Sequence, residues 1–156
     1  MATFKTFKDL ACYRMAREFR KTVSEFCRTL PKEETYRLKD QFIRASRSAA
    51  ANIAEGFGRH HHQENAQYCR HARGSLFECI EHLAVALDEE YLKRDEYDAM
   101  RVHLDETIKI LNGYIAYLQR CARHGVPAKN GQSLAESPIT YELDNSATQQ
   151  SNNLTT

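Results

Sequence analysis

The sequence has few residues that interrupt regular structure. It contains three prolines, six glycines and no tryptophan in 156 residues. So few turn-forming residues exclude a turn-rich β-sandwich and favour long, uninterrupted helices. No apolar run approaches the roughly 20 residues of a membrane-spanning helix, and the N-terminal MATFKTFKDL contains no apolar signal core. We therefore expect no membrane association.

The cysteines form neither a disulfide framework nor a metal-binding motif. There are five, an odd number, and no two of them stand in a Cys-x-x-Cys spacing. This usage predicts reduced, buried thiols in a cytoplasmic protein. The five are Cys12, Cys27, Cys69, Cys79 and Cys121.

Charge is nearly balanced over the whole chain but unevenly distributed along it. The formal net charge of +1 excludes a histone-like polycation. Residues 126–156 carry one lysine against three acidic residues, which is −2, and are otherwise mostly small and polar. We predict that they form a disordered tail. Removing −2 from +1 leaves +3 on residues 1–125, the predicted folded domain.

Apolar residues in the predicted folded domain recur at alternating spacings of four and three, as in amphipathic helices. Thr6 with Asp9 is the predicted N-terminal cap of the first helix, and Asp95 that of the fourth. The predicted helices run over residues 6–30, 31–58, 63–90 and 95–124. Because the connections are short, we expect an all-α, antiparallel up-down-up-down four-helix bundle.

Each predicted helix has an apolar stripe that should face the core. The stripes are Cys12, Ala16, Phe19, Val23 and Phe26; Leu38, Phe42, Ala45, Ala49 and Asn52 or Ile53; Tyr68, Ala72, Ser75, Cys79, Leu83 and Ala86; and Leu104, Ile108, Leu111, Ile115 and Leu118. The second and third helices are rich in Ala, Ser and Gly, Gly74 included, which predicts either close packing against each other or a subunit interface. Ile43, Leu76 and Ile80 lie off the stripes and favour oligomerisation.

The segment 52–59, NIAEGFGR, closes the second predicted helix. Gly56 and Gly58 can adopt the left-handed conformation that ends a helix. Phe57 between them can fold back over the end of the bundle as an apolar plug. This interpretation gives the segment a structural role.

The polar residues of the same segment allow two interpretations. Asn52 and Glu55 can hydrogen-bond the backbone of the following turn and the start of the third predicted helix, in keeping with the structural role. Alternatively, Glu55 and Arg59 contact a ligand.

The segment belongs to a longer ordered pattern. It is preceded by Phe7-x-Asp9-Leu10, Leu30-Pro31-x-Glu33-Glu34 and Gln41-x-x-Arg44-Ala45-x-x-Ser48, and followed by Tyr68, Gly74-Ser75 and Glu78. With this pattern the chain resembles, over about residues 4–122, the four-helix-bundle family of 23S rRNA intervening-sequence proteins, also called S23 ribosomal proteins.

The resemblance implies a cytosolic bundle that forms homopentameric rings, in a family without an established enzymatic activity. It also implies kinship with the accessory proteins of diversity-generating retroelements, which bind a reverse transcriptase and structured RNA. The chain departs from the family pattern twice. Residues 49–51 are all alanine where the family often has a large aliphatic residue and a proline, and Tyr13 replaces a tryptophan.

Basic residues concentrate in residues 32–73, where eight Lys and Arg face five acidic residues, a net charge of +3. Guanidinium groups match phosphate oxygens well, so this region is the candidate nucleic-acid surface. The alternative is a solvated or partner-facing surface. The candidate contact residues are Arg37, Arg44, Arg47, Arg59, Arg70 and Arg73.

Signals for other chemistry are weak. Residues 60–62 are all histidine and, with Cys69, Cys121 and His124, form a conceivable zinc site, although such a run is more typical of a solvated basic patch. No catalytic or nucleotide-binding motif is present, so we expect no enzyme, cofactor or metal.

The sequence thus predicts a homo-oligomeric adaptor or scaffold that binds structured RNA, and the resemblance implies that the oligomer is a pentamer. The alternative is a protein-interaction module that docks a partner protein without contacting nucleic acid.

Overall fold

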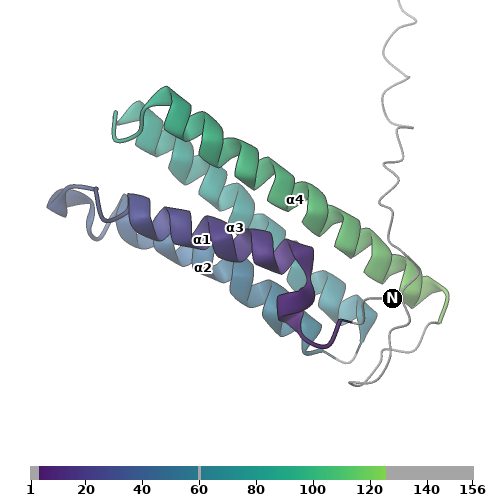
Figure 1. Ribbon diagram of the computed structural model, residues 1–156. Helices are drawn as coiled ribbons and strands as arrows, with labels where there is room; N and C mark the ends of the chain where they lie inside the picture. Colours follow the sequence, from purple (N-terminus) through teal and green to yellow (C-terminus); the bar gives the residue numbers. More distant parts are fainter. Residues whose placement is uncertain (1–3, 60, 126–156) are drawn as a thin grey trace, which may run out of the picture.

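The structure is a computed structural model that describes residues 4–59 and 61–125. These residues form four α-helices and two short 3-10 helices, without a β-strand. In chain order the elements are η1 (Phe7–Asp9), α1 (Ala11–Phe26), η2 (Lys32–Glu34), α2 (Leu38–Phe57), α3 (His62–Asp88) and α4 (Arg94–Arg123). Successive α-helices run in opposite directions, which confirms the predicted four-helix bundle (Figure 1). The predicted tail, residues 126–156, lies outside the described residues.

The two ends of the bundle carry different parts of the chain. At one end α2 stops and α3 starts, and the beginning of α1 and the end of α4 lie at this end too (Figure 1). We call it the α2–α3 end. The opposite end holds the connections from α1 to α2 and from α3 to α4.

All four helices contribute to one continuous apolar core. The predicted stripes of α2 and α4 are buried, with Ile53 rather than Asn52 at the last position of the α2 stripe. In α1 the stripe is buried up to Val23, and Phe26 packs partly buried against the core. The prediction is right for these three helices because most of the large apolar residues of each lie on one face.

The predicted α3 stripe is partly wrong. Ala72, Cys79, Leu83 and Ala86 are buried as expected, but Tyr68 and Ser75 are only half-buried. The buried positions beside these four are Asn65, Ala66, Cys69, Leu76 and His82. The face that α3 turns to the core is therefore rotated toward Cys69 and Leu76.

This rotation removes the support for exposed apolar patches. Leu76 is fully buried, and Ile43 and Ile80 are half-buried against the core. The large apolar side chains that are exposed among the described residues are instead Tyr36, Phe77 and Val102. Ile43, Leu76 and Ile80 thus give no support to oligomerisation.

Two predicted helix starts differ from the structure. Thr6 and Asp9 do form a reciprocal capping box, but it caps η1 rather than α1, which begins at Ala11. The predicted cap Asp95 lies inside α4. The backbone N–H of Lys93, just before α4, instead donates to the Glu96 carboxylate at 3.0 Å.

The start of α2 lies seven residues after the predicted one. Pro31 precedes η2, and α2 begins at Leu38 because Arg37 has non-helical backbone angles, φ −112° and ψ −112°. The Glu34 carboxylate accepts from the Leu38 N–H at 3.1 Å and from the Tyr91 hydroxyl at 3.3 Å. The Glu34 side chain therefore accepts from a free backbone N–H at the start of α2 and joins this start to the α3–α4 connection.

Close packing between α2 and α3 is confirmed, and this is the most extensive helix contact in the bundle. A Cβ added at Gly56 would lie 2.8 Å from Asn65 Oδ1 and 2.9 Å from Tyr68 Cβ. The close approach of α3 thus requires a residue without a Cβ at position 56. Gly74, also in the predicted small-residue set, faces open space, with nothing within 4 Å of an added Cβ.

The cysteines are free and buried, as predicted. Burial raises the pKa of Cys12, Cys69 and Cys79 to about 12 and that of Cys27 to about 11. No helix in the described ranges combines the length and apolar character needed to cross a membrane.

Gly56 and Gly74, one in each of the two helices, provide a matched test of the α2–α3 contact. We expect Gly56→Ala to lower the free energy of unfolding by about 1–3 kcal/mol, because the methyl group must displace α3. Gly74→Ala should raise it by about 0.5–1 kcal/mol, because an exposed helical glycine gains propensity without a clash. Urea denaturation of both variants measures the difference. Equal effects would contradict the close approach at Gly56.

Candidate functional site at the α2–α3 end

A charged cluster joins the last turn of α2 to α3. Arg59 Nη2 donates to Glu55 Oε1 at 2.6 Å and to the Tyr68 hydroxyl oxygen at 2.6 Å. The guanidinium carbon also lies 4.7 Å from the centre of the Tyr68 ring. The hydrogen bond from Arg59, together with the Tyr68 hydroxyl, lowers the pKa of Glu55 below its ordinary value. Glu55 and Arg59 therefore bind each other and Tyr68. The interpretation that Glu55 and Arg59 contact a ligand needs these same charged groups, which are already bonded within the chain.

A second polar cluster lies further from this end. Asn52 Nδ2 donates to the Ser48 carbonyl oxygen at 2.9 Å and to Ser48 Oγ at 3.1 Å. The Ser48 and Ser75 hydroxyl groups are 2.9 Å apart, joining α2 to α3. The prediction that Asn52 and Glu55 bond the turn backbone is wrong. Asn52 bonds one turn back along its own helix, and Glu55 bonds side chains.

The predictions for Phe57 and the glycines have different outcomes. Phe57 packs partly buried against the core, as a plug should. Neither glycine is left-handed: Gly56 lies inside α2, and Gly58 is its C-cap with φ −72°. Within residues 4–59 and 61–125, the left-handed glycine is Gly125, with φ +62°, at the predicted end of α4.

Asn65 is a buried residue of α3 that the predicted stripe does not include, and it forms polar contacts. Its Nδ2 donates to the Tyr114 hydroxyl of α4 at 3.0 Å, and its Oδ1 accepts from the Cys69 thiol at 3.5 Å. Burial raises the pKa of Tyr114, so its hydroxyl stays protonated at physiological pH. A signal for the burial of Asn65 is present in the sequence. Cys69 follows Asn65 by four residues and Ala72 follows Cys69 by three, which is the spacing of a buried helical stripe.

The six predicted arginines fall into two groups. Arg59 has the partners described above, Arg73 Nη1 donates to Asn112 Oδ1 of α4 at 2.9 Å, and Arg44 lies 3.7 Å from the Asp40 carboxylate. The other three guanidinium groups have no hydrogen bond or ion pair within the described residues. They are Arg37, Arg47 and Arg70, all exposed.

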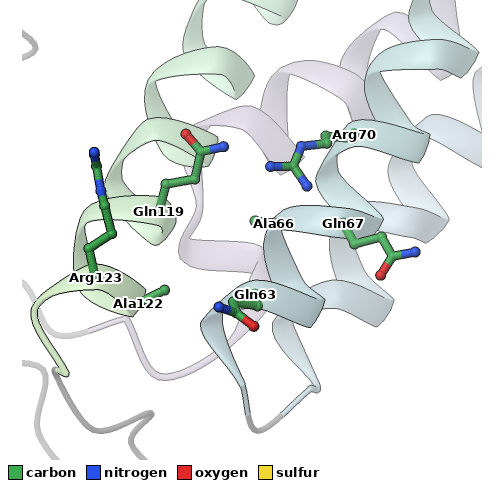
Figure 2. A pocket seen from close by; sticks show the side chains of 7 residues that line it. All are labelled: Gln63, Ala66, Gln67, Arg70, Gln119, Ala122 and Arg123. Atoms are coloured by element: carbon green, nitrogen blue, oxygen red, sulfur yellow. The ribbon is translucent and has the colours of Figure 1, made fainter.

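The arginines are not gathered in one patch. Arg44 lines a groove between α2 and α3 together with Gln41, Ala45, Ser48 and Glu78, so a carboxylate stands in the same groove. Arg70 lines a different groove, between α3 and α4 at the α2–α3 end (Figure 2). We call the latter the α3–α4 groove. Its lining residues are Gln63, Ala66, Gln67, Arg70, Gln119, Ala122 and Arg123.

His82 is a buried polar residue that no sequence pattern indicates. It lies in α3, with its ring 5.6 Å from that of Phe42 between centroids. Its Nε2 atom has no hydrogen-bond partner among the described residues, and the Glu78 carboxylate is 3.6 Å away.

Residues 4–59 and 61–125 contain no group of three or more His, Cys, Asp or Glu side chains that could hold a metal ion. The thiol of Cys69 is bonded to Asn65, and His60 lies outside the described residues. The zinc alternative therefore has no geometric support in this part of the chain.

Comparison with known proteins identifies the family. Residues 8–113, well over half of the chain, match the family described as 23S rRNA-intervening sequence protein. The chain belongs to this family. Within the matched range lie both polar clusters and four of the seven residues that line the α3–α4 groove.

A solved structure supports the fold. The crystal structure of a protein of unknown function from the S23 ribosomal protein family of Bacteroides thetaiotaomicron VPI-5482 is similar, with a TM-score of 0.64. The two sequences are 22% identical, and the alignment covers 70% of this chain and 98% of the other. No curated protein matches the chain.

The Glu55 cluster predicts a specific pH response. Because the folded-state pKa of Glu55 lies below the unfolded value, its stabilising effect is present above the ordinary glutamate pKa of 4.5. That effect is lost as the pH falls through the folded-state pKa. In an NMR titration of the carboxyl carbon, Glu55 should titrate below 4.5, and Arg59→Gln should raise its midpoint more than Tyr68→Phe. Arg47→Gln, which has no contact with Glu55, is the control, and an unchanged midpoint in Arg59→Gln would contradict the cluster.

Proposed function

We propose that the chain is a non-enzymatic, homo-oligomeric adaptor that binds structured RNA through exposed arginines. The observation that carries this proposal is that Arg37, Arg47 and Arg70 are exposed and have no partner within the described residues. An unpaired guanidinium can bind a phosphate without first breaking an ion pair. Arg44 can join them, since its contact with Asp40 is long and exposed.

The family supports RNA as the ligand class. The description of the matching family names 23S rRNA, and the net charge of +3 on residues 32–73 has the sign that a phosphate backbone requires. The sequence contains none of the catalytic motifs considered above, so binding rather than catalysis is the proposed activity. Kinship with the accessory proteins of diversity-generating retroelements stays a prediction.

Assembly would strengthen a weak surface. One chain presents few unpaired arginines, whereas a ring of five would present five copies to one RNA and gain affinity by multivalency. Phe77 and Val102, both more than half exposed, are the apolar side chains that we propose for the subunit contact. We place the protein in the cytoplasm, in keeping with its five free cysteines.

A protein partner is the second candidate. Tyr36 is 91% exposed, directly before Arg37, and tyrosine and arginine are enriched in protein interfaces. On this alternative the end of the bundle that holds the α1–α2 connection docks a partner protein, such as a reverse transcriptase, without contacting nucleic acid.

Salt dependence separates the two candidates. Binding of a structured rRNA fragment, measured by fluorescence anisotropy, should weaken steeply between 50 and 200 mM salt. Arg44→Glu with Arg47→Glu should reduce the affinity at least tenfold while the circular dichroism spectrum stays helical. The control is Arg28→Glu with Lys109→Glu, which changes the charge equally outside residues 32–73. Absence of binding even at low salt would refute the RNA function.

Assembly has its own test. Light scattering at micromolar concentration should give a mass about five times the 18.0 kDa of one chain. We expect Phe77→Asp to lower that mass with little loss of helicity, because the side chain is exposed in the single chain. A monomeric mass for the unsubstituted protein would rule out the ring.

A further inference from the structure

We propose that the α3–α4 groove binds an unpaired segment of RNA, with Arg70 and Arg123 on the phosphates and the glutamines on the base edges. The inference rests on the proposed RNA-binding function and makes it specific. It adds Arg123, Gln63, Gln67 and Gln119 to the contact residues, none of which the sequence pattern indicates.

The chemistry of the groove walls is the first argument. The seven lining residues provide two guanidinium groups, three primary amides and two methyl groups, and no carboxylate. The α2–α3 groove differs, because Glu78 lines it beside Arg44. An anion therefore meets no opposing charge among the residues that line the α3–α4 groove.

The second argument is that both guanidinium groups are available. Arg70 and Arg123 form no ion pair or hydrogen bond within the described part of the chain. Arg123 lies in the last turn of α4, where a cation also complements the helix dipole. Arg70 lies well inside α3, so a favourable interaction with a helix end does not account for an arginine at this position. The groove therefore has one unpaired arginine on each of its two helices, and each can contact a phosphate.

Two of the lining side chains are directed into the groove. Figure 2 shows Arg70 on α3 and Gln119 on α4 directed toward the space between the two helices. Ala66 and Ala122 leave that space unfilled because their side chains are small. One turn further along α3, the hydrogen bond from Arg73 to Asn112 joins the two helices and fixes their separation there.

The amides favour unpaired nucleotides over a duplex. A glutamine side chain offers a donor and an acceptor, the combination that base edges recognise. In an RNA duplex those edges are paired or lie in a deep, narrow groove, whereas loops and bulges expose them. The groove should therefore prefer a loop to a duplex, which phosphate attraction alone would not do.

The test compares two RNA probes on the full chain. One is a fluorescein-labelled hairpin with an eight-nucleotide loop, and the other is a blunt duplex with the same number of phosphates. We expect the protein to bind the hairpin at least fivefold more tightly. Arg70→Gln with Arg123→Gln should weaken hairpin binding at least tenfold and reduce the salt slope by about 0.7 for each phosphate that is no longer neutralised.

A second variant isolates the amides. Gln67→Ala with Gln119→Ala keeps the charge and should lower hairpin affinity several-fold while leaving duplex affinity within twofold. The control, Arg28→Gln with Lys109→Gln, removes two exposed charges elsewhere and should change hairpin affinity less than threefold. All these side chains are exposed, and thermal melting checks that each variant is folded.

The possible outcomes test the groove proposal separately from the proposed RNA-binding function. Hairpin binding that is unaffected by Arg70→Gln with Arg123→Gln would overturn the groove and leave RNA binding in place. Equal affinity for hairpin and duplex would overturn base recognition. Failure to bind either RNA at 50 mM salt would refute the RNA function, and the groove proposal with it.

Discussion

The contact between α2 and α3 at Gly56 is the constraint on which the rest of this end of the bundle depends. Because no Cβ separates the two helices there, Asn65 and Tyr68 lie directly against α2. Asn65 can then reach Tyr114 on α4, and Tyr68 can reach Arg59. One missing side chain thus determines which polar groups meet, and these contacts hold three helices in fixed relation without a charged group in the core.

The sequence is sufficient for the fold because large apolar residues mark the inner faces of α1, α2 and α4. It is less informative for α3, where most residues of the predicted stripe are small and the large Leu76 and Ile80 lie beside it, so that several rotations of the helix bury similar apolar area. Periodicity therefore places Leu76 outward and Tyr68 inward, whereas in the structure Leu76 is fully buried and Tyr68 only half-buried. Helix starts are also misplaced, since a cap such as Thr6 with Asp9 serves a 3-10 turn as well as an α-helix.

The candidate site is predictable in composition but not in arrangement. The arginines can be selected from charge alone, but their partners depend on distances between helices. Arg59 and Arg73 are bonded to Tyr68 and Asn112, nine and 39 residues away in the chain, which no local pattern reveals. The glutamines of the α3–α4 groove carry no charge and follow no motif, so they give no signal until α3 and α4 are placed side by side.

The buried thiols have a practical consequence for anyone who studies this protein. Thiolates rather than thiols react with maleimides and oxidants, and a pKa near 12 leaves Cys12, Cys69 and Cys79 almost wholly protonated at neutral pH. Cys27 and Cys121 are shielded by burial as well. A single cysteine introduced on the surface should therefore take up a dye or spin label selectively, with the five native cysteines left buried and unlabelled.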